Sequence, residues 1–171
     1  MYAIRAARAR ELPGLCALER AADQRFHQVG LGHLAEGAPR RPESLAPACA
    51  AGRLFVVDDG REPVGFVLLE LVDQGLHLSE LSVAPDHGRR GLGRRLVEFV
   101  CEWGRVQGFD ALTLTTYRDV AWNGPFYQRL GFRVIPEASL GEGLRALRRA
   151  EAAQGLDPET RDVMRRELFG P

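Results

Sequence analysis

Lysine is absent from this chain of 171 residues, because all 23 of its basic residues are arginine, and 23 acidic residues balance them. The missing lysine excludes a Walker-type phosphate loop, whose GxxxxGK[ST] pattern requires that residue. The balanced charge gives the chain no overall field that would attract nucleic acid or an anionic membrane. Neither is therefore an expected partner.

Cysteine is scarce, and the hydrophobic runs are short. Cys16, Cys49 and Cys101 are widely spaced in helix-like apolar patterns, which favours small buried residues over a disulfide framework. The sequence contains no CxxC or His/Cys spacing typical of a metal site, so we expect no metal. No apolar run approaches the roughly 20 residues of a membrane span. We expect one domain, residues 1–171, in the reducing cytoplasm.

Hydrophobic periodicity divides the chain into alternating strands and helices. Residues 26–42 are rich in Gly and Pro, which favours either a functional lid or an ordinary mobile loop. Residues 160–168 are compatible with a helix or with a final strand. The pattern as a whole predicts an α/β domain with a mixed sheet. We expect strands at 2–7, 53–57, 63–71, 76–84, 111–116 and 132–136, and helices at 11–25, 42–51, 92–106, 120–130 and 140–154.

One stretch, HLSELSVAPDHGRRGLGRRL from His77 to Leu96, has the order strand, proline, Arg/Gly loop, helix. A helix start presents unpaired N–H groups and the positive end of the helix dipole, and glycines let a phosphate approach them closely. The order therefore predicts an anion site. A dinucleotide loop, GxGxxG, would need a third glycine, but Arg94, Arg95 and Leu96 follow Gly93.

Two motifs in this sequence resemble those of the GNAT superfamily of N-acetyltransferases. The first, GRRGLG at 88–93, is similar to the family's Arg/Gln-x-x-Gly-x-Gly/Ala signature, although Gly88 stands where the family has Arg or Gln. The second, NGPFY at 123–127 followed by LGF at 130–132, is similar to a later family motif. The resemblance implies a mixed, mostly antiparallel twisted sheet of six to seven strands with flanking helices, splayed after strand 4. Residues 137–171 would then complete the sheet and the substrate side.

By the same resemblance, the cosubstrate would be acetyl-CoA, with its pyrophosphate held by backbone N–H groups of the 88–93 loop. Asn123 would hydrogen-bond the pantetheine arm; as an alternative, it only satisfies local backbone at a helix start. The residues expected to bind the cofactor are Leu81, Ser82, Val83, Gly88, Arg89, Arg90, Gly91, Leu92, Gly93, Arg94, Asn123 and Phe126.

Direct transfer of acetyl to an amine needs a neutral amine, a donor for the oxyanion and a proton or hydrogen bond for the thiolate. Tyr127 matches the family's acid; otherwise it is a packed helix tyrosine. Glu80 is the candidate base, because burying an unpaired carboxylate in an otherwise apolar strand costs free energy and therefore indicates a specific role. The alternative is an ion pair with an arginine on a neighbouring strand. The Val83 backbone N–H would polarise the acetyl carbonyl.

The acceptor cannot be identified from the sequence. A small molecule, an amino acid or a protein N-terminus would each supply a primary amine, and a homodimer is possible. Two other functions remain open: transfer of a different acyl chain, and a CoA-binding regulatory module without catalysis. Arginine pairs at 40–41, 148–149 and 165–166 are expected to be solvated, because acidic residues are interspersed among them.

Overall fold

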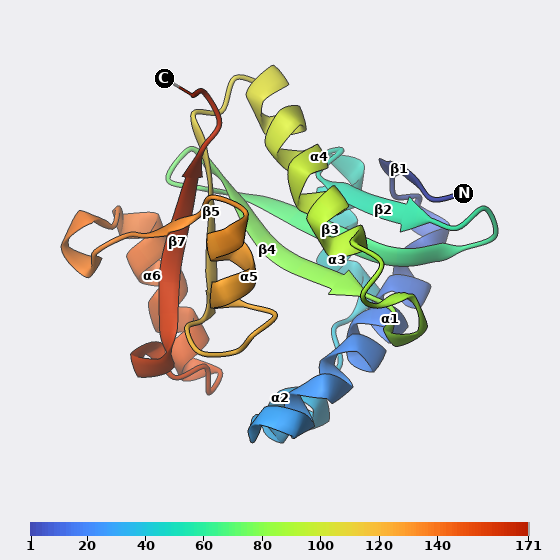
Figure 1. Ribbon diagram of the computed structural model, residues 1–171, viewed down its shortest axis with the longest axis horizontal. Helices are drawn as coiled ribbons and strands as arrows, with labels where there is room; N and C mark the ends of the chain where they lie inside the picture. Colours follow the sequence, from blue (N-terminus) through green and yellow to red (C-terminus); the bar gives the residue numbers. More distant parts are fainter. Residues whose placement is uncertain (171) are drawn as a thin grey trace. The chain divides into compact units, whose positions relative to one another are not determined.

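The structure is a computed structural model that describes residues 1–170, so Pro171, the last residue of the predicted domain, lies outside the described residues. Within this range the strands form one seven-stranded sheet in the order β1-β2-β3-β4-β5-β7-β6 (Figure 1). The pairs β1–β2, β2–β3, β5–β7 and β6–β7 are antiparallel, and β4–β5 is parallel. The predicted mixed, mostly antiparallel sheet is therefore confirmed.

The strands are β1 (Ala3–Ala6), β2 (Leu54–Asp58), β3 (Pro63–Val72), β4 (Gly75–Val83), β5 (Ala111–Tyr117), β6 (Arg133–Val134) and β7 (Arg161–Glu167). The α-helices are α1 (Leu12–Asp23), α2 (Gly32–Glu36), α3 (Pro42–Ala50), α4 (Leu92–Val106), α5 (Gly124–Arg129) and α6 (Glu142–Ala153). Short 3₁₀ turns are η1 (Ala9–Glu11), η2 (Gln24–Val29), η3 (Pro85–His87), η4 (Glu137–Ser139) and η5 (Pro158–Thr160).

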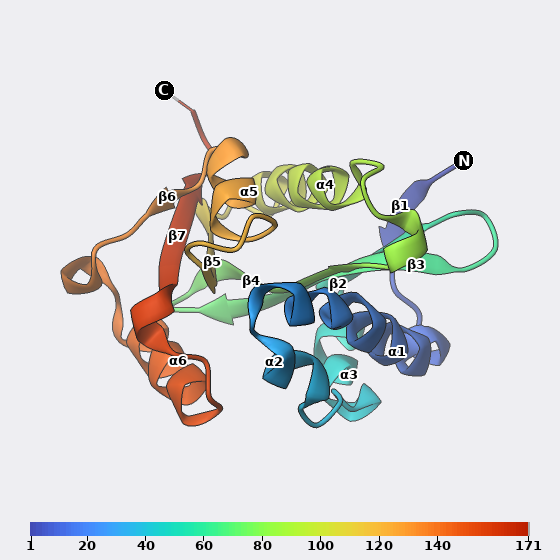
Figure 2. The same cartoon turned by 60° about the horizontal axis from the view of Figure 1, so that its bottom comes forward.

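The chain forms two compact units, of which the first comprises Met1–Leu69 and Ser79–Val100. Its core lies where α1 and α3 cover β2 and β3; Leu15, Leu45, Val56 and Phe66 are each at most 1% exposed. Because successive strand residues point to opposite faces, Phe55 points away from this core. Its ring packs edge-on against Phe99 of α4 at 5.1 Å between centroids. Helices thus cover both faces of the β2–β3 ladder, as Figure 2 shows.

The second unit comprises Glu70–Leu78 and residues 101–170, and its main ladder pairs β5 with β7 over seven residues. Leu144 of α6 and Leu140, which precedes the helix, pack on it in one apolar cluster with Val163. The β3–β4 turn fixes the start of α6, because the Asp73 carboxylate accepts hydrogen bonds from the Gly143 and Leu144 N–H groups at 2.6 and 3.0 Å. A carboxylate at a helix N-terminus satisfies unpaired donors and complements the dipole.

Two segments differ from the elements that the sequence predicted, and a third segment, which the sequence left ambiguous, is a strand. Helix α5 begins at Gly124, not at 120, because the chain folds back so tightly there that a Cβ on Gly124 would lie 2.6 Å from the Arg118 carbonyl oxygen. Residues 26–42 contain η2 and α2 instead of an irregular loop. In the ambiguous C-terminal segment the Asp157 side chain caps the single turn η5, and the chain then continues as strand β7.

Candidate active site

The predicted phosphate loop lies in the first unit and ends at the start of α4. Arg89 and Gly91 both have left-handed backbone, with φ of 59° and 73°. Such a conformation is costly for a non-glycine residue, and it is found at functional loops. The first helical hydrogen bond runs from the Arg95 N–H to the Gly91 carbonyl at 3.0 Å. The N–H groups of residues 92–94 therefore lack helical partners, and this arrangement suits an anion.

Tyr2 holds part of this loop in place. Its hydroxyl contacts His87 Nδ1 at 2.9 Å and accepts from Arg90 at 3.1 Å, and its carbonyl accepts from Arg95 at 3.1 Å. Arg90 and Arg95 are exposed, so their charges remain available in front of the helix start. The side chain of Leu92, by contrast, is buried, so that this residue can offer a ligand only its backbone.

Gly88 occupies the position where the family signature has Arg or Gln. Its N–H donates to the Pro85 carbonyl at 3.1 Å, which closes the turn η3. A Cβ on Gly88 would lie 3.1 Å from the same oxygen, tighter than a side chain accepts without a shift. The tight turn thus favours glycine here, and the neighbouring arginines carry the positive charge.

The end of β4 leaves a backbone donor open. The Ala84 N–H donates to the Val64 carbonyl at 2.8 Å, and backbone groups of successive strand residues point to opposite sides. The Val83 N–H therefore points away from β3. The parallel ladder that joins β4 to β5 consists of residues 76–78 paired with 112–114, and Val83 lies beyond it.

Glu80 lies on the face of β4 that it shares with Ser82. Its Oε1 accepts from the Ser82 hydroxyl at 2.9 Å and from the Leu81 N–H at 3.1 Å. Its Oε2 lies 3.7 Å from the Arg40 guanidinium, and the side chain is 23% exposed. The candidate base is thus held in one orientation and remains partly accessible. The cation beside it comes from the segment before α3, and not from a neighbouring strand.

Two further carboxylates, Glu19 and Asp23, come from the last turns of α1. Arg40 forms a two-pronged ion pair with Glu19, at 2.6 and 3.1 Å. Burial, followed by repulsion from Glu19 and Asp23, raises the pKa of Glu80 to about 8. Burial, followed by repulsion from Glu19, raises the pKa of Asp23 to about 6. Arg40, which is paired with Glu19, lowers both pKa values but offsets these effects only in part.

A cavity of about 50 Å³ is lined in part by Glu19, Arg20, Asp23 and Arg40; Glu80 lies near these groups and is not part of its lining. Sequence patterns did not reveal this site. The prediction that Arg40 is solvated was wrong, since its side chain is only 27% exposed and is paired with Glu19. The sequence feature that could have pointed to this cluster is the spacing of Glu19 and Asp23, which lie one helical turn apart near the predicted end of the first helix.

The second unit contains the remaining predicted residues, Asn123, Phe126 and Tyr127. Asn123 precedes α5, and its Oδ1 accepts from the Thr116 hydroxyl at 2.9 Å and from the Tyr117 N–H at 3.4 Å. Its side chain thus ties α5 to the end of β5 and makes no helix cap. Tyr127 is 8% exposed, and its ring packs edge-on against Phe126 and Phe132. Both alternatives considered for Tyr127 are compatible with this packing.

Neither a metal centre nor a membrane span is evident in residues 1–170. No group of three or more His, Cys, Asp or Glu side chains in this range could hold a metal ion. No helix in the described part is both long enough and apolar enough to cross a membrane. His77, the first residue of the strand–loop–helix stretch, is buried at 2% exposure and contacts the Thr113 hydroxyl at 2.8 Å.

Comparison with known proteins gives a match to the model of the acetyltransferase (GNAT) family over residues 23–132. Three solved structures share the fold at low identity. N-acetylglutamate synthase from Neisseria gonorrhoeae, complexed with coenzyme A and N-acetyl-glutamate, has a TM-score of 0.73 at 19% identity; the match covers 99% of this chain and 36% of that one. The ribosomal-protein-S18-alanine N-acetyltransferase of Escherichia coli has a TM-score of 0.69 at 18% identity, covering 100% and 96%. A GNAT-family acetyltransferase from Staphylococcus aureus has a TM-score of 0.72 at 15% identity, covering 99% and 100%.

Proposed function

The chain belongs to the GNAT family of acetyltransferases, and we propose that it is an N-acetyltransferase that moves acetyl from acetyl-CoA directly to a primary amine. The observation that carries the proposal is Glu80, a fixed carboxylate whose pKa is raised to about 8 on the strand that also holds the open Val83 N–H. A base with a pKa near the working pH is the kind that proton abstraction requires.

The start of α4 suits the pyrophosphate of coenzyme A. The N–H groups of residues 92–94 lack helical partners, and the left-handed residues Arg89 and Gly91 shape the loop in front of them. Arg90 and Arg94 add exposed positive charge. When bound, acetyl-CoA supplies an acetyl thioester. The remaining chemistry falls to side chains and backbone groups of the protein.

In the proposed reaction Glu80 accepts a proton from the acceptor ammonium, directly or through water, so that the nitrogen gains a free lone pair. The Ser82 hydroxyl and the Leu81 N–H orient the carboxylate for this step. The Val83 N–H donates to the acetyl oxygen, where negative charge develops as the C–N bond forms. As the C–S bond breaks, Tyr127 donates a proton to the departing sulfur, and the proton that the new amide nitrogen loses restores the tyrosine through solvent. Asn123 and Phe126 contact the pantetheine arm.

The acceptor is proposed to be a cationic primary amine of a small molecule or a protein N-terminus. Arg40 is paired with Glu19 and lies near Glu80, and although Arg25, Arg40 and Arg20 all act on Asp23, the pKa values of Asp23 and Glu80 both remain raised. These carboxylates favour an incoming ammonium, which lowers the cost of ionising Glu80. No cysteine contributes, and the transfer passes through no acyl-enzyme.

The test is release of free CoA from acetyl-CoA across a panel of primary amines, with Tyr127→Phe as a matched variant. We expect turnover with at least one cationic amine and a large loss of kcat in the variant. If acetyl-CoA raises the melting temperature and no amine supports turnover, the protein is a CoA-binding module. If NAD and not acetyl-CoA stabilises it, the cofactor assignment fails. Propionyl-CoA and succinyl-CoA, assayed in parallel, test the acyl chain.

A further inference from the structure

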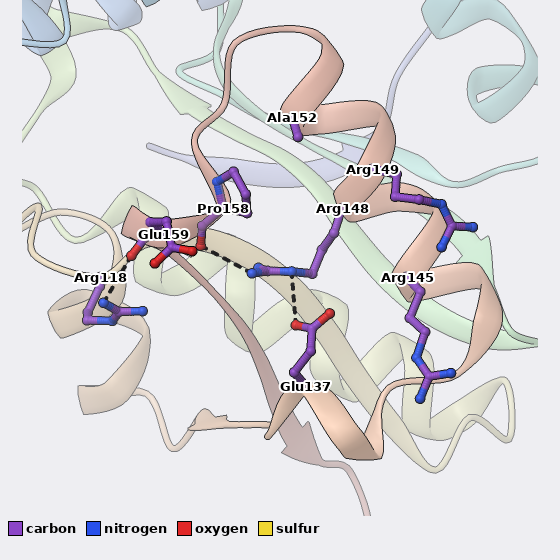
Figure 3. A pocket seen from close by; sticks show the side chains of 8 residues that line it. All are labelled: Arg118, Glu137, Arg145, Arg148, Arg149, Ala152, Pro158 and Glu159. Atoms are coloured by element: carbon purple, nitrogen blue, oxygen red, sulfur yellow. Dashed lines mark hydrogen bonds and ion pairs between the residues drawn. The ribbon is translucent and has the colours of Figure 1, made fainter.

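A second and larger cavity, of about 580 Å³, lies in the second unit between α6 and the turn η5 (Figure 3). None of the acetyl-transfer residues proposed above lines it. Its volume is within the range of small-molecule sites, roughly 300–1,000 Å³. Its charged lining comprises four arginines and two glutamates, in a protein with no net charge: Arg118, Arg145, Arg148, Arg149, Glu137 and Glu159.

Arg148 is fixed at the wall of this cavity. It donates to the carbonyls of Arg161 and Pro158, both at 3.2 Å, and its Nε lies 3.3 Å from a Glu137 carboxylate oxygen (Figure 3). The side chain is 15% exposed, whereas that of Glu137 is 67% exposed. Carbonyl groups orient a guanidinium without cancelling its charge, and the exposed carboxylate is strongly screened. Ala152, one turn further along α6, is too small to cover Arg148.

Arg145 and Arg149 are successive exposed residues on one side of α6 (Figure 3). Like charges four residues apart destabilise a helix by about 0.2–0.5 kcal/mol. Arg149 has a partner, Glu142, at 2.7 Å, but both side chains are more than 60% exposed, so that the pair is weak. Arg145 forms no ion pair within residues 1–170. A bound anion would remove the repulsion between the two arginines.

The charge of Arg118 is less available to a ligand than the charges of the arginines on α6. It makes a two-pronged pair with Asp162, the shortest contact being 2.8 Å, and donates to the Glu159 carbonyl at 3.2 Å. These bonds hold it against the η5 segment, at the opposite end of the lining from Arg145 in Figure 3. The lining therefore has two guanidiniums held by hydrogen bonds, those of Arg118 and Arg148, and two more exposed ones, those of Arg145 and Arg149 (Figure 3).

We infer that this cavity binds a small multivalent anion, a di- or polyphosphate group, through the forked N–H donors of Arg145, Arg148 and Arg149. Guanidinium forks match phosphate oxygens in pairs, and the bonds are charge-assisted. The volume of about 580 Å³ favours a small ligand over a nucleic-acid strand. The phosphate group has two possible sources: it is part of the acceptor, or it belongs to a separate effector.

The test is calorimetric titration of inorganic pyrophosphate into the full chain, with and without saturating CoA, which fills the competing loop at α4. The variant is Arg145→Gln/Arg149→Gln. The control, Arg129→Gln/Arg133→Gln, removes the same charge from exposed residues of the same unit outside the cavity lining. We expect the cavity variant to bind pyrophosphate at least tenfold more weakly with CoA present, and the control to bind as the parent does.

Equal binding by parent and cavity variant would overturn the inference, as would an equal loss in the control. The titration measures binding and not turnover, so its result tests the site even if no amine is acetylated. For an active enzyme, pyrophosphate that competes with the amine and raises only its KM identifies the anion as part of the acceptor. A change of kcat in the parent that is lost in the cavity variant identifies a separate effector. Both outcomes uphold the site.

Discussion

Replacing Glu80 with glutamine tests the proposed base directly. With a pKa of about 8, about one tenth of the Glu80 carboxyls are ionised at pH 7, so kcat/KM of the parent should rise about tenfold from pH 7 to a plateau above pH 8. Glutamine keeps the size of the side chain and cannot accept the proton. We expect kcat/KM at pH 8.5 to fall by about 10²–10⁴, the usual contribution of a positioned general base.

The acceptor amine also titrates in this range, so the shape of the profile alone does not identify Glu80. Substitutions of Ser82 and Asp23 distinguish Glu80 from the amine, because the two substitutions should shift the pKa of Glu80 in opposite directions. Ser82→Ala removes a hydrogen bond that favours the carboxylate, and should move the profile to higher pH. Asp23→Asn removes a repelling charge, and should move it to lower pH. The pKa of the free amine is the same in all these assays.

The measurement is kcat/KM from pH 6 to 9.5, by CoA release at several concentrations of the best amine. Melting curves at pH 7 establish that each variant is folded. The reasoning is refuted if Glu80→Gln keeps the parent rate and profile. It is refuted equally if Ser82→Ala and Asp23→Asn leave the midpoint where the parent has it, because the titrating group would then lie outside this cluster.

Three further predictions concern other parts of the chain. Burial lowers the pKa of His77 from 6.5 to about 4, so its contribution to stability is complete above pH 6.5 and falls by about 2 kcal/mol between pH 7 and 5. The raised pKa values of Glu80 and Asp23 change stability in the opposite direction in parent and variant alike, so the measurement is the difference in the free energy of unfolding between the parent and His77→Gln in urea, which should fall by about 2 kcal/mol from pH 7 to 5. Tyr127→Phe should lower kcat by about 10²-fold with little change in the KM for acetyl-CoA, both measured at saturating amine. An unchanged kcat would show that Tyr127 has no part in the mechanism. Gly65→Ala should cost about 1–3 kcal/mol in urea unfolding, because the added Cβ would lie 3.0 Å from the Ser82 carbonyl oxygen; stability equal to the parent's would mean that β3 moves aside freely.

The order of elements was predictable because each has a strong local signal. The apolar run of β3 and the amphipathic face of α4 both depend on periodicity within a single segment. The exact ends were less predictable, because tertiary contacts decide them. Asp73, in a turn about 70 residues earlier in the chain, holds the first turn of α6, and no pattern within residues 140–154 reveals this contact.

The loop at 88–93 was predictable for a similar reason. Its glycines, its proline and the following helix are neighbours in the sequence, so that its chemistry is local. What the sequence left open was why glycine replaces the expected Arg or Gln at position 88. The turn η3 provides the reason, since the Gly88 N–H closes onto Pro85 with no room for an unstrained side chain. In the proposed complex, binding of the anion would therefore depend more on backbone donors than on a leading side chain.

The carboxylates near Glu80 could not be predicted, because sequence periodicity locates apolar side chains and does not show which charged side chains become buried. Hydrophobic periodicity identifies the buried face of a helix from its apolar residues, and Glu19 and Asp23 of α1 read as part of the solvated face. They are brought to Glu80 by the packing of α1 on the sheet, and Arg40 arrives from a different segment. Partial burial of these carboxylates and their mutual repulsion cost stability when they are ionised, as the raised pKa values of Glu80 and Asp23 indicate. A bound ammonium removes this cost, so a cationic amine should raise the melting temperature even without acetyl-CoA, and Asp23→Asn should weaken that effect.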